Sequence, residues 1–118
     1  MNRLLSYIND LQCYAEEALL FIEGMTEADF LKDRKTQQAV TLNLITLGEI
    51  STTLKQKEPD FLLLTDFIPW KDIAGMRHRL VHGYNEIDPL LVWETLNHQV
   101  SKLLEQIPRL VDLVNQGK

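Results

Sequence analysis

The side chains best suited to chemistry lie within one short segment, residues 71–82, which holds three basic residues, two histidines and one acidic residue. The whole chain of 118 residues, by contrast, has a formal net charge of −5. Histidine can donate or accept a proton near neutral pH, and arginine can stabilise negative charge that develops during a reaction. The segment therefore indicates a site for an anionic ligand such as a phosphodiester, and its candidate side chains are Lys71, Arg77, His78, Arg79 and His82.

Two other interpretations of this segment remain open. The first is a solvated basic face at the end of a helix, which needs no ligand. The second is a metal site built on His78 and His82, although the sequence shows no third ligand for it. The remaining histidine, His98, is flanked by polar residues and is interpreted as a surface residue.

The segment itself is predicted to form a helix, with Pro69 as its first helical residue and Gly83 at its end. On such a helix His78 and His82 are about one turn apart and share a face. Arg77 and His82 lie about 140° apart on an ideal helix, so they converge only if Arg77 reaches round the helix or the helix is distorted before Gly83. We expect His82 in the last turn, where the helix dipole favours a protonated imidazole.

Two longer helices are expected to frame this segment. Apolar residues from Leu4 to Ile22 recur at the three- and four-residue steps of a one-faced helix, which Gly24 ends. Residues 39–50 are apolar nearly all round, which predicts the most buried helix of the chain. Because Gly48 lowers the helix propensity there by about 1 kcal/mol, we expect another helix to approach it closely.

The rest of the chain also divides into pieces of helical length. Residues 59–69 are predicted to be a connector or a short helix. Asp88 followed by Pro89 predicts the start of a last helix, which Pro108 must kink or divide because proline cannot donate the backbone hydrogen bond. We therefore expect a single all-α domain over residues 1–118, an up-down bundle of four or five helices.

Composition narrows the class of protein. Hydrophobic residues make up 45% and charged residues 25% of the chain, as in ordinary globular domains. The acidic balance excludes a protein that coats nucleic acid through bulk positive charge. A single cysteine, Cys13, excludes an intrachain disulfide and is interpreted as a small buried thiol. No apolar run approaches the roughly 20 residues that span a bilayer, and we expect a cytoplasmic protein.

The motif Arg77-x4-His82-x-Tyr84 resembles the Arg-x(4–6)-His motif of HEPN domains, in the form typical of the HepT-like family. The resemblance covers nearly the whole chain and is most specific over residues 69–94. Further matching stretches are Leu47-Gly48-Glu49, Pro69-Trp70, Ile73-Ala74-Gly75-Met76, Asp88 and Val92-Trp93-Glu94. One position departs from the family pattern, because the family often has Asn directly after the motif arginine and this chain has His78.

This resemblance implies a toxin of a two-gene module whose partner is an antitoxin with a nucleotidyltransferase fold. It implies a symmetric homodimer in which the motifs of both protomers line one cleft. It further implies RNA cleavage without a metal or other cofactor, using the 2′-hydroxyl of the RNA itself. The antitoxin of such modules can transfer AMP to the motif tyrosine, which corresponds to Tyr84.

The expected roles of the residues follow from that chemistry. His82 would transfer protons and Arg77 would stabilise the charge of the phosphorane. Lys71, His78 and Arg79 would hold flanking phosphates. Glu49 would brace Arg77 across the bundle, or would be only a solvated acid. Trp70 and Trp93 are interpreted as core or dimer-face anchors rather than as platforms for base stacking.

Two rival functions remain. The chain could be a non-catalytic accessory subunit of a nucleotidyltransferase, which binds nucleotide or presents Tyr84 without cleaving RNA. The departure at His78 keeps that alternative open. A purely structural helical dimerisation domain is the third possibility.

Overall fold

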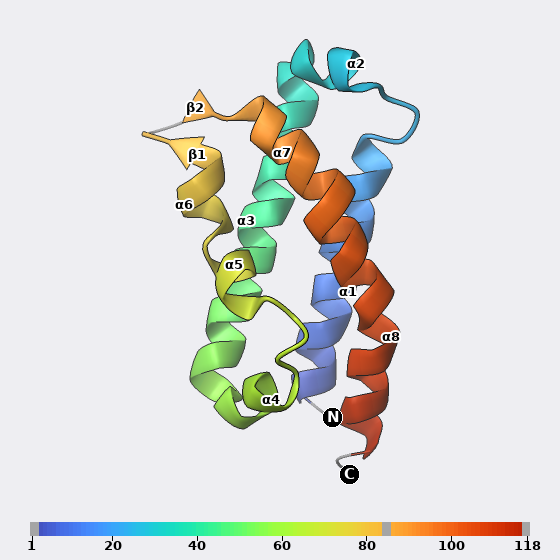
Figure 1. The fold of residues 1–118 in the computed structure, drawn as a ribbon, viewed down its shortest axis with the longest axis vertical. Coiled ribbons are helices and arrows are strands. Elements are labelled where there is room, and N and C mark those ends of the chain that lie inside the picture. The colour runs from blue at the N-terminus through green and yellow to red at the C-terminus, as the bar shows by residue number, and fades with distance from the viewer. Residues whose placement is uncertain (1–2, 84–85, 117–118) are drawn as a thin grey trace.

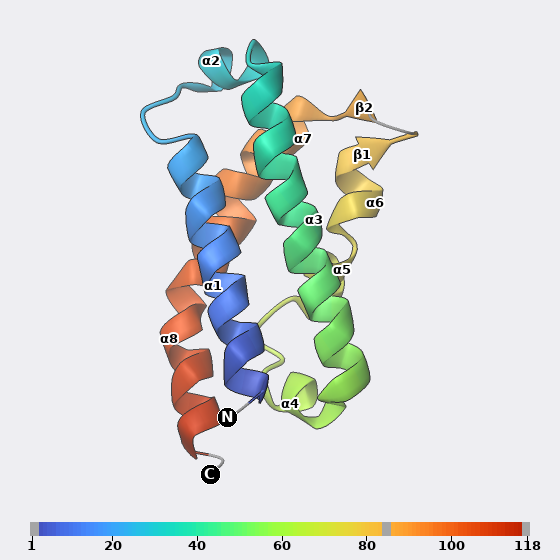
Figure 2. The same ribbon diagram turned by 180° about the vertical axis from the view of Figure 1, so that it is seen from behind.

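The fold, given by a computed structural model that describes residues 3–83 and 86–116, is a bundle of three long helical rods with shorter elements at their sides and ends (Figure 1). The rods are α1 (Arg3–Phe21), α3 (Arg34–Lys57) and a C-terminal rod made of α7 (Pro89–Thr95), the π-helical turn η1 (Leu96–Val100) and α8 (Ser101–Gln116). Helix α1 packs against both other rods, and Figure 2 shows it alongside α3. No helix in the described ranges is long and apolar enough to cross a membrane.

The shorter elements complete the bundle. Helix α2 (Glu27–Leu31) lies at one end and α4 (Pro59–Leu64) at the other, while α5 (Trp70–Ala74) and α6 (Met76–Leu80) lie against α3 (Figure 1). A small antiparallel hairpin follows α6, with strands β1 (Val81–His82) and β2 (Glu86–Ile87). The predicted all-α class is confirmed. The described residues form eight α-helices rather than four or five, and several of them are short.

The core forms as the apolar spacing predicts. On α1 the fully buried side chains recur every three or four residues, at Ile8, Leu11, Ala15 and Ala18. Trp70 is buried and its indole nitrogen donates a hydrogen bond to Thr65 Oγ1 at 3.0 Å. The ring of Trp93 lies 5.3 Å from that of Phe30. Both tryptophans thus pack within this chain, as expected of core residues.

Cys13 is exposed, so the interpretation of a buried thiol was wrong. The reason is its position on the helix. Cys13 lies two residues after the buried Leu11 and two before the buried Ala15, which turns it about 200° away from the core-facing stripe.

The predicted close approach at Gly48 is confirmed. A Cβ atom at this position would lie 2.9 Å from the carbonyl oxygen of Ile73 and 3.3 Å from that of Ala74. Contacts below 3.0 Å essentially never occur for real Cβ atoms. The missing side chain therefore lets α5 lie directly on α3, which fixes where the following residues begin.

The predicted helix over residues 69–82 is wrong in three respects. It begins after Pro69, it is interrupted at Gly75, and it ends at Leu80. Val81 adopts extended dihedral angles and Gly83 turns the chain with φ of 67°. The backbone N–H of Asp88 then donates to the carbonyl of Leu80 at 2.9 Å and holds the returning strand in place.

The C-terminal rod bears on two predictions, its start at Asp88 and the effect of Pro108. Asp88 caps α7 and Pro89 is its first residue, as predicted. Helix α8 continues through Pro108, so of the two predicted effects of the proline, a kink or a division, the division does not occur. The irregular turn lies earlier, at η1, where the Ser101 hydroxyl donates to the carbonyl of Leu96 five residues before it.

Candidate active site at the end of α6

An open pocket of about 690 Å³ lies where α6 gives way to the hairpin. It brings together side chains from the middle of α3 and from the motif segment. Its lining residues are Glu49, Ala74, Arg77, His78, Val81, His82 and Gly83. The two residues with the predicted catalytic roles, Arg77 and His82, therefore share one pocket.

The end of α6 explains how they come together. Arg77 and His82 are five positions apart in the sequence, and on a continuous helix they would point about 140° apart. The chain instead leaves the helix after Leu80 and enters β1 with His82. Of the two conditions for their convergence, the departure from the helix before Gly83 is the one that the structure shows. His82 does not lie in a helical turn, so the predicted helix-dipole effect and the helical pairing with His78 were wrong.

The site is accessible and polar. Arg77, His78 and Glu49 are exposed, and the side chain of His82 is 58% exposed. Glu49 lines the pocket with Arg77 but forms no ion pair with any residue that the structure describes. Two histidines and an arginine in one pocket can bind an anion and move a proton beside it.

Sequence reasoning missed one neighbour of the site. Asp88 Oδ2 lies 3.9 Å from His82 Nε2. Asp88 was recognised only as a helix cap, and the signal that could have revealed its second contact is its short spacing from His82 across a glycine turn. The side chains of Asp88 and His82 lie on the same face only because the hairpin forms, and no pattern in the sequence predicted the hairpin.

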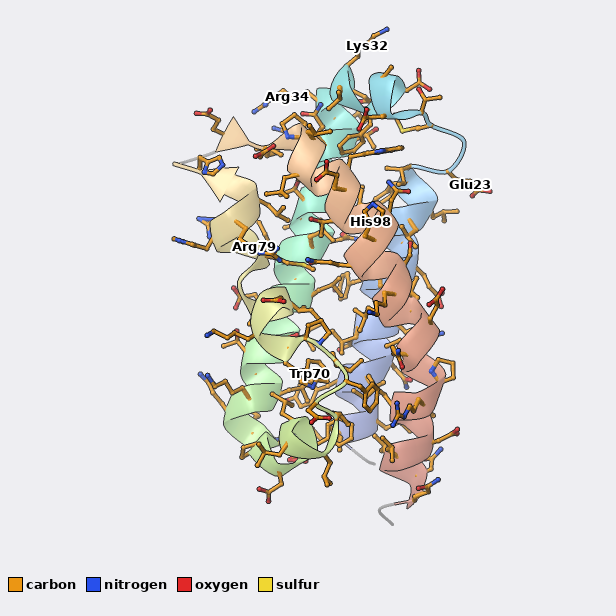
Figure 3. The ribbon with its side chains drawn as sticks, viewed as in Figure 1. Glu23, Lys32, Arg34, Trp70, Arg79 and His98 are labelled. Carbon is orange, nitrogen blue, oxygen red and sulfur yellow. The ribbon has the colours of Figure 1, made fainter. Side chains whose placement is uncertain are left out.

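Two predicted phosphate ligands lie outside this pocket. Lys71 lines a separate pocket of about 570 Å³ with mainly apolar walls, next to Trp70 and Lys55. The Arg79 guanidinium points toward the C-terminal rod, where its Nη2 donates to the Asp72 carbonyl at 2.9 Å and to Gln99 Oε1 at 3.3 Å (Figure 3). Arg79 thereby ties α5, α6 and η1 together.

The remaining predictions concern Tyr84, His98 and a metal site. Tyr84, the predicted modification site, lies outside the described residues, although Gly83 before it lines the pocket. His98 is exposed on η1, as expected of a surface residue (Figure 3). Over residues 3–83 and 86–116, no group of three or more His, Cys, Asp or Glu side chains is arranged to hold a metal ion.

Comparison with known proteins identifies the class to which this helical fold and this pocket belong. The family described as ribonuclease HepT-like matches residues 11–110, a range that contains every residue of the pocket. The chain belongs to the HepT-like ribonuclease family.

Individual relatives agree with this assignment. "Probable ribonuclease HepT" of Thermococcus cleftensis is 34% identical over 108 residues, which cover 88% of this chain and 92% of that protein. A "Putative RNase" of Methanocaldococcus jannaschii is 29% identical over 106 residues, which cover 90% of this chain and 85% of that protein. No solved structure matches the chain closely enough for a comparison.

Proposed function

We propose that this protein is a metal-independent endoribonuclease, the toxin of a two-gene module, with Arg77 and His82 as its catalytic residues. The observation that supports this most directly is that both side chains line one open pocket although their spacing would separate them on a helix. Membership of a family of ribonucleases supports RNA as the substrate.

The chemistry is an internal transfer within the RNA. The 2′-oxygen attacks the adjacent phosphorus, the new O2′–P bond forms, and the P–O5′ bond breaks. The products are a 2′,3′-cyclic phosphate and a 5′-hydroxyl. A neutral His82 accepts the proton of the 2′-hydroxyl, and a protonated imidazole gives one to the departing 5′-oxygen. Arg77 stabilises the extra negative charge on the phosphorane. His78, in the same pocket, holds a neighbouring phosphate.

A homodimer would supply both imidazoles at one cleft. Arg77 also lines a second hollow, of about 240 Å³, which is formed with residues of α3 and of the hairpin. That hollow is bordered by Leu42, Ile45, Val81 and Ile87, and Leu42 is 64% exposed. An exposed leucine beside a catalytic arginine fits a contact with a second protomer. We therefore assign the dimer interface to this face, with the two pockets adjoining it.

The antitoxin completes the proposed module. A nucleotidyltransferase that adds AMP to Tyr84 would introduce a phosphate and a base next to Gly83, which lines the pocket. That addition would compete directly with RNA. The accessory-subunit function is the second candidate, and the observation that favours it is His78 at the position where the family often has Asn.

The test is incubation of the purified protein with total RNA and tRNA in excess EDTA. We expect cleavage by the wild type, and a loss of about 100-fold or more in His82→Ala, because general acid–base catalysis typically contributes 10²–10⁴-fold. His98→Ala is the matched control, since it removes an exposed histidine outside the pocket. Intact mass must first show that the protein carries no AMP. Unmodified wild type that leaves RNA intact would support the accessory subunit instead.

A further inference from the structure

We propose that Asp88 is a positioning residue for His82, holding its imidazole in the orientation and tautomer that the reaction needs. This inference rests on the function proposed above. The resemblance to the HepT-like family assigns Asp88 only a position at the start of the last helix.

The hairpin brings the two side chains to one face. His82 is paired with Glu86 across the two strands, and Asp88 lies two residues beyond Glu86. Side chains two residues apart on a strand point to the same side, so Asp88 is the diagonal neighbour of His82. The hydrogen bond from Asp88 N–H to the Leu80 carbonyl extends this register. The result is the separation of 3.9 Å between Asp88 Oδ2 and His82 Nε2.

The two oxygens of Asp88 have different partners. Oδ1 accepts a hydrogen bond from the Leu91 backbone N–H at 3.2 Å and so caps α7. This bond fixes the carboxylate to the end of a rigid rod while leaving Oδ2 directed at the imidazole. The Asp88 side chain is 39% exposed, compared with 58% for His82. Among the described residues His82 has no other ion pair or side-chain hydrogen bond, so Asp88 is the group that can restrain it.

The consequence concerns the tautomer. A carboxylate facing Nε2 favours the neutral ring that carries its proton on Nε2. Nδ1 is then unprotonated and free to accept the proton of the 2′-hydroxyl. The same carboxylate stabilises the imidazolium that forms, as an aspartate does beside a catalytic histidine in other enzymes. Other charged or titratable groups near His82 are Arg77, His78 and Glu49 in the pocket and Glu86 across the strands.

Asp88→Asn separates the two functions of this side chain. Asparagine retains the oxygen that caps α7, so the rod and the hairpin should persist. It loses the negative charge, and its amide N–H can face Nε2 instead. Asp88→Ser is the second variant, because serine also caps helices but is too short to reach His82. The matched control is Glu86→Gln, which removes a charge from the same face of the hairpin without touching the cap.

Two measurements test the proposal. We expect kcat on a short RNA in EDTA to fall about tenfold or more in Asp88→Asn and Asp88→Ser, a part of what acid–base catalysis supplies, with KM unchanged. In long-range ¹H–¹⁵N spectra of the free protein, we expect the neutral His82 ring to carry its proton on Nε2 in the wild type and to shift toward Nδ1 in Asp88→Asn. Glu86→Gln should behave as wild type in both.

The spectra decide the inference even if the wild type cleaves no RNA, because they need no substrate. A His82 tautomer that is the same in the wild type and Asp88→Asn would overturn it. So would an equal fall in kcat for Glu86→Gln, since that would indicate a general effect of charge. If the wild type cleaves no RNA but Asp88→Asn shows the predicted tautomer change, the ribonuclease function is contradicted and the Asp88–His82 interaction is still supported.

Discussion

Gly48 and Ile73 belong to helices that touch through their backbones: a Cβ on Gly48 would lie 2.9 Å from the Ile73 carbonyl oxygen. This contact sets the distance between α3, which contributes Glu49 to the pocket, and α5, which leads into the motif segment. The missing side chain of Gly48 therefore sets the spacing of the two helices on which the candidate active site is built.

Gly48→Ala is expected to destabilise the protein. Alanine would favour the helix by about 1 kcal/mol, but overpacking against a backbone carbonyl typically costs 1–3 kcal/mol, and the steric term should prevail. Urea unfolding followed by circular dichroism measures the difference. Gly75→Ala is the matched control, because its Cβ would lie at an ordinary 3.5 Å from the Lys71 carbonyl. Equal stability of Gly48→Ala and the wild type would show that the steric cost is no larger than the roughly 1 kcal/mol that alanine contributes to the helix.

The two arginines of the motif segment should have separable roles. Arg79→Ala removes the hydrogen bonds to Asp72 and Gln99 and should lower the free energy of unfolding by about 1–3 kcal/mol. Arg77→Ala removes an exposed side chain and should leave the unfolding free energy within about 0.5 kcal/mol of wild type. Ribonuclease assays should show the opposite order, with the greater loss in Arg77→Ala. A large loss of stability in Arg77→Ala would contradict this division.

Leu42→Lys is expected to disrupt the proposed dimer. A lysine there would put a charge into the apolar hollow that Leu42 shares with Arg77, and desolvation of that charge opposes association. Size-exclusion chromatography with light scattering should show a monomer. Leu63→Lys is the control, because Leu63 is also exposed, at 78%, but lies on α4 away from the site. If Leu63→Lys instead separates the protomers, the interface lies at α4.

Stability should fall in acid partly through Asp33. The Asp33 carboxylate accepts hydrogen bonds from the Thr36 hydroxyl and backbone N–H, which hold its pKa below the ordinary value of 3.8. A lowered pKa in the folded state stabilises the fold above the unfolded pKa, and this stabilisation is lost as the pH falls through the folded value. The free energy of unfolding should be measured from roughly pH 6 to pH 2. It should fall less steeply with decreasing pH in Asp33→Asn than in the wild type. An identical decline in both proteins would exclude this contribution.

His78 should contribute to binding more than to turnover. If it holds a phosphate beside the scissile bond, His78→Ala should raise KM about tenfold, the loss of one hydrogen bond to a charged group, with kcat nearly unchanged. His78→Asn, which restores the residue that the family often has, should recover most of the binding. A fall in kcat alone would instead place His78 among the residues that transfer protons.

The sequence by itself determined the helical class, the buried faces, the cap at Asp88 and the close approach at Gly48. These depend on local spacing and residue type, such as the repeat of Ile8, Leu11 and Ala15 on α1. It also supplied the family motif, since Arg77 and His82 are five residues apart in any fold.

Only the tertiary structure decided how that motif is shaped. Whether α6 stops at Leu80 depends on the strand that returns to pair with Val81 and on the bond from Asp88 N–H to Leu80, which are contacts between residues that helical periodicity does not relate. The same holds for Arg79, whose partner Gln99 lies twenty residues away on the π-helical turn. Local propensity favoured a continuous helix through His82, but long-range hydrogen bonds and packing outweighed it and produced the pocket.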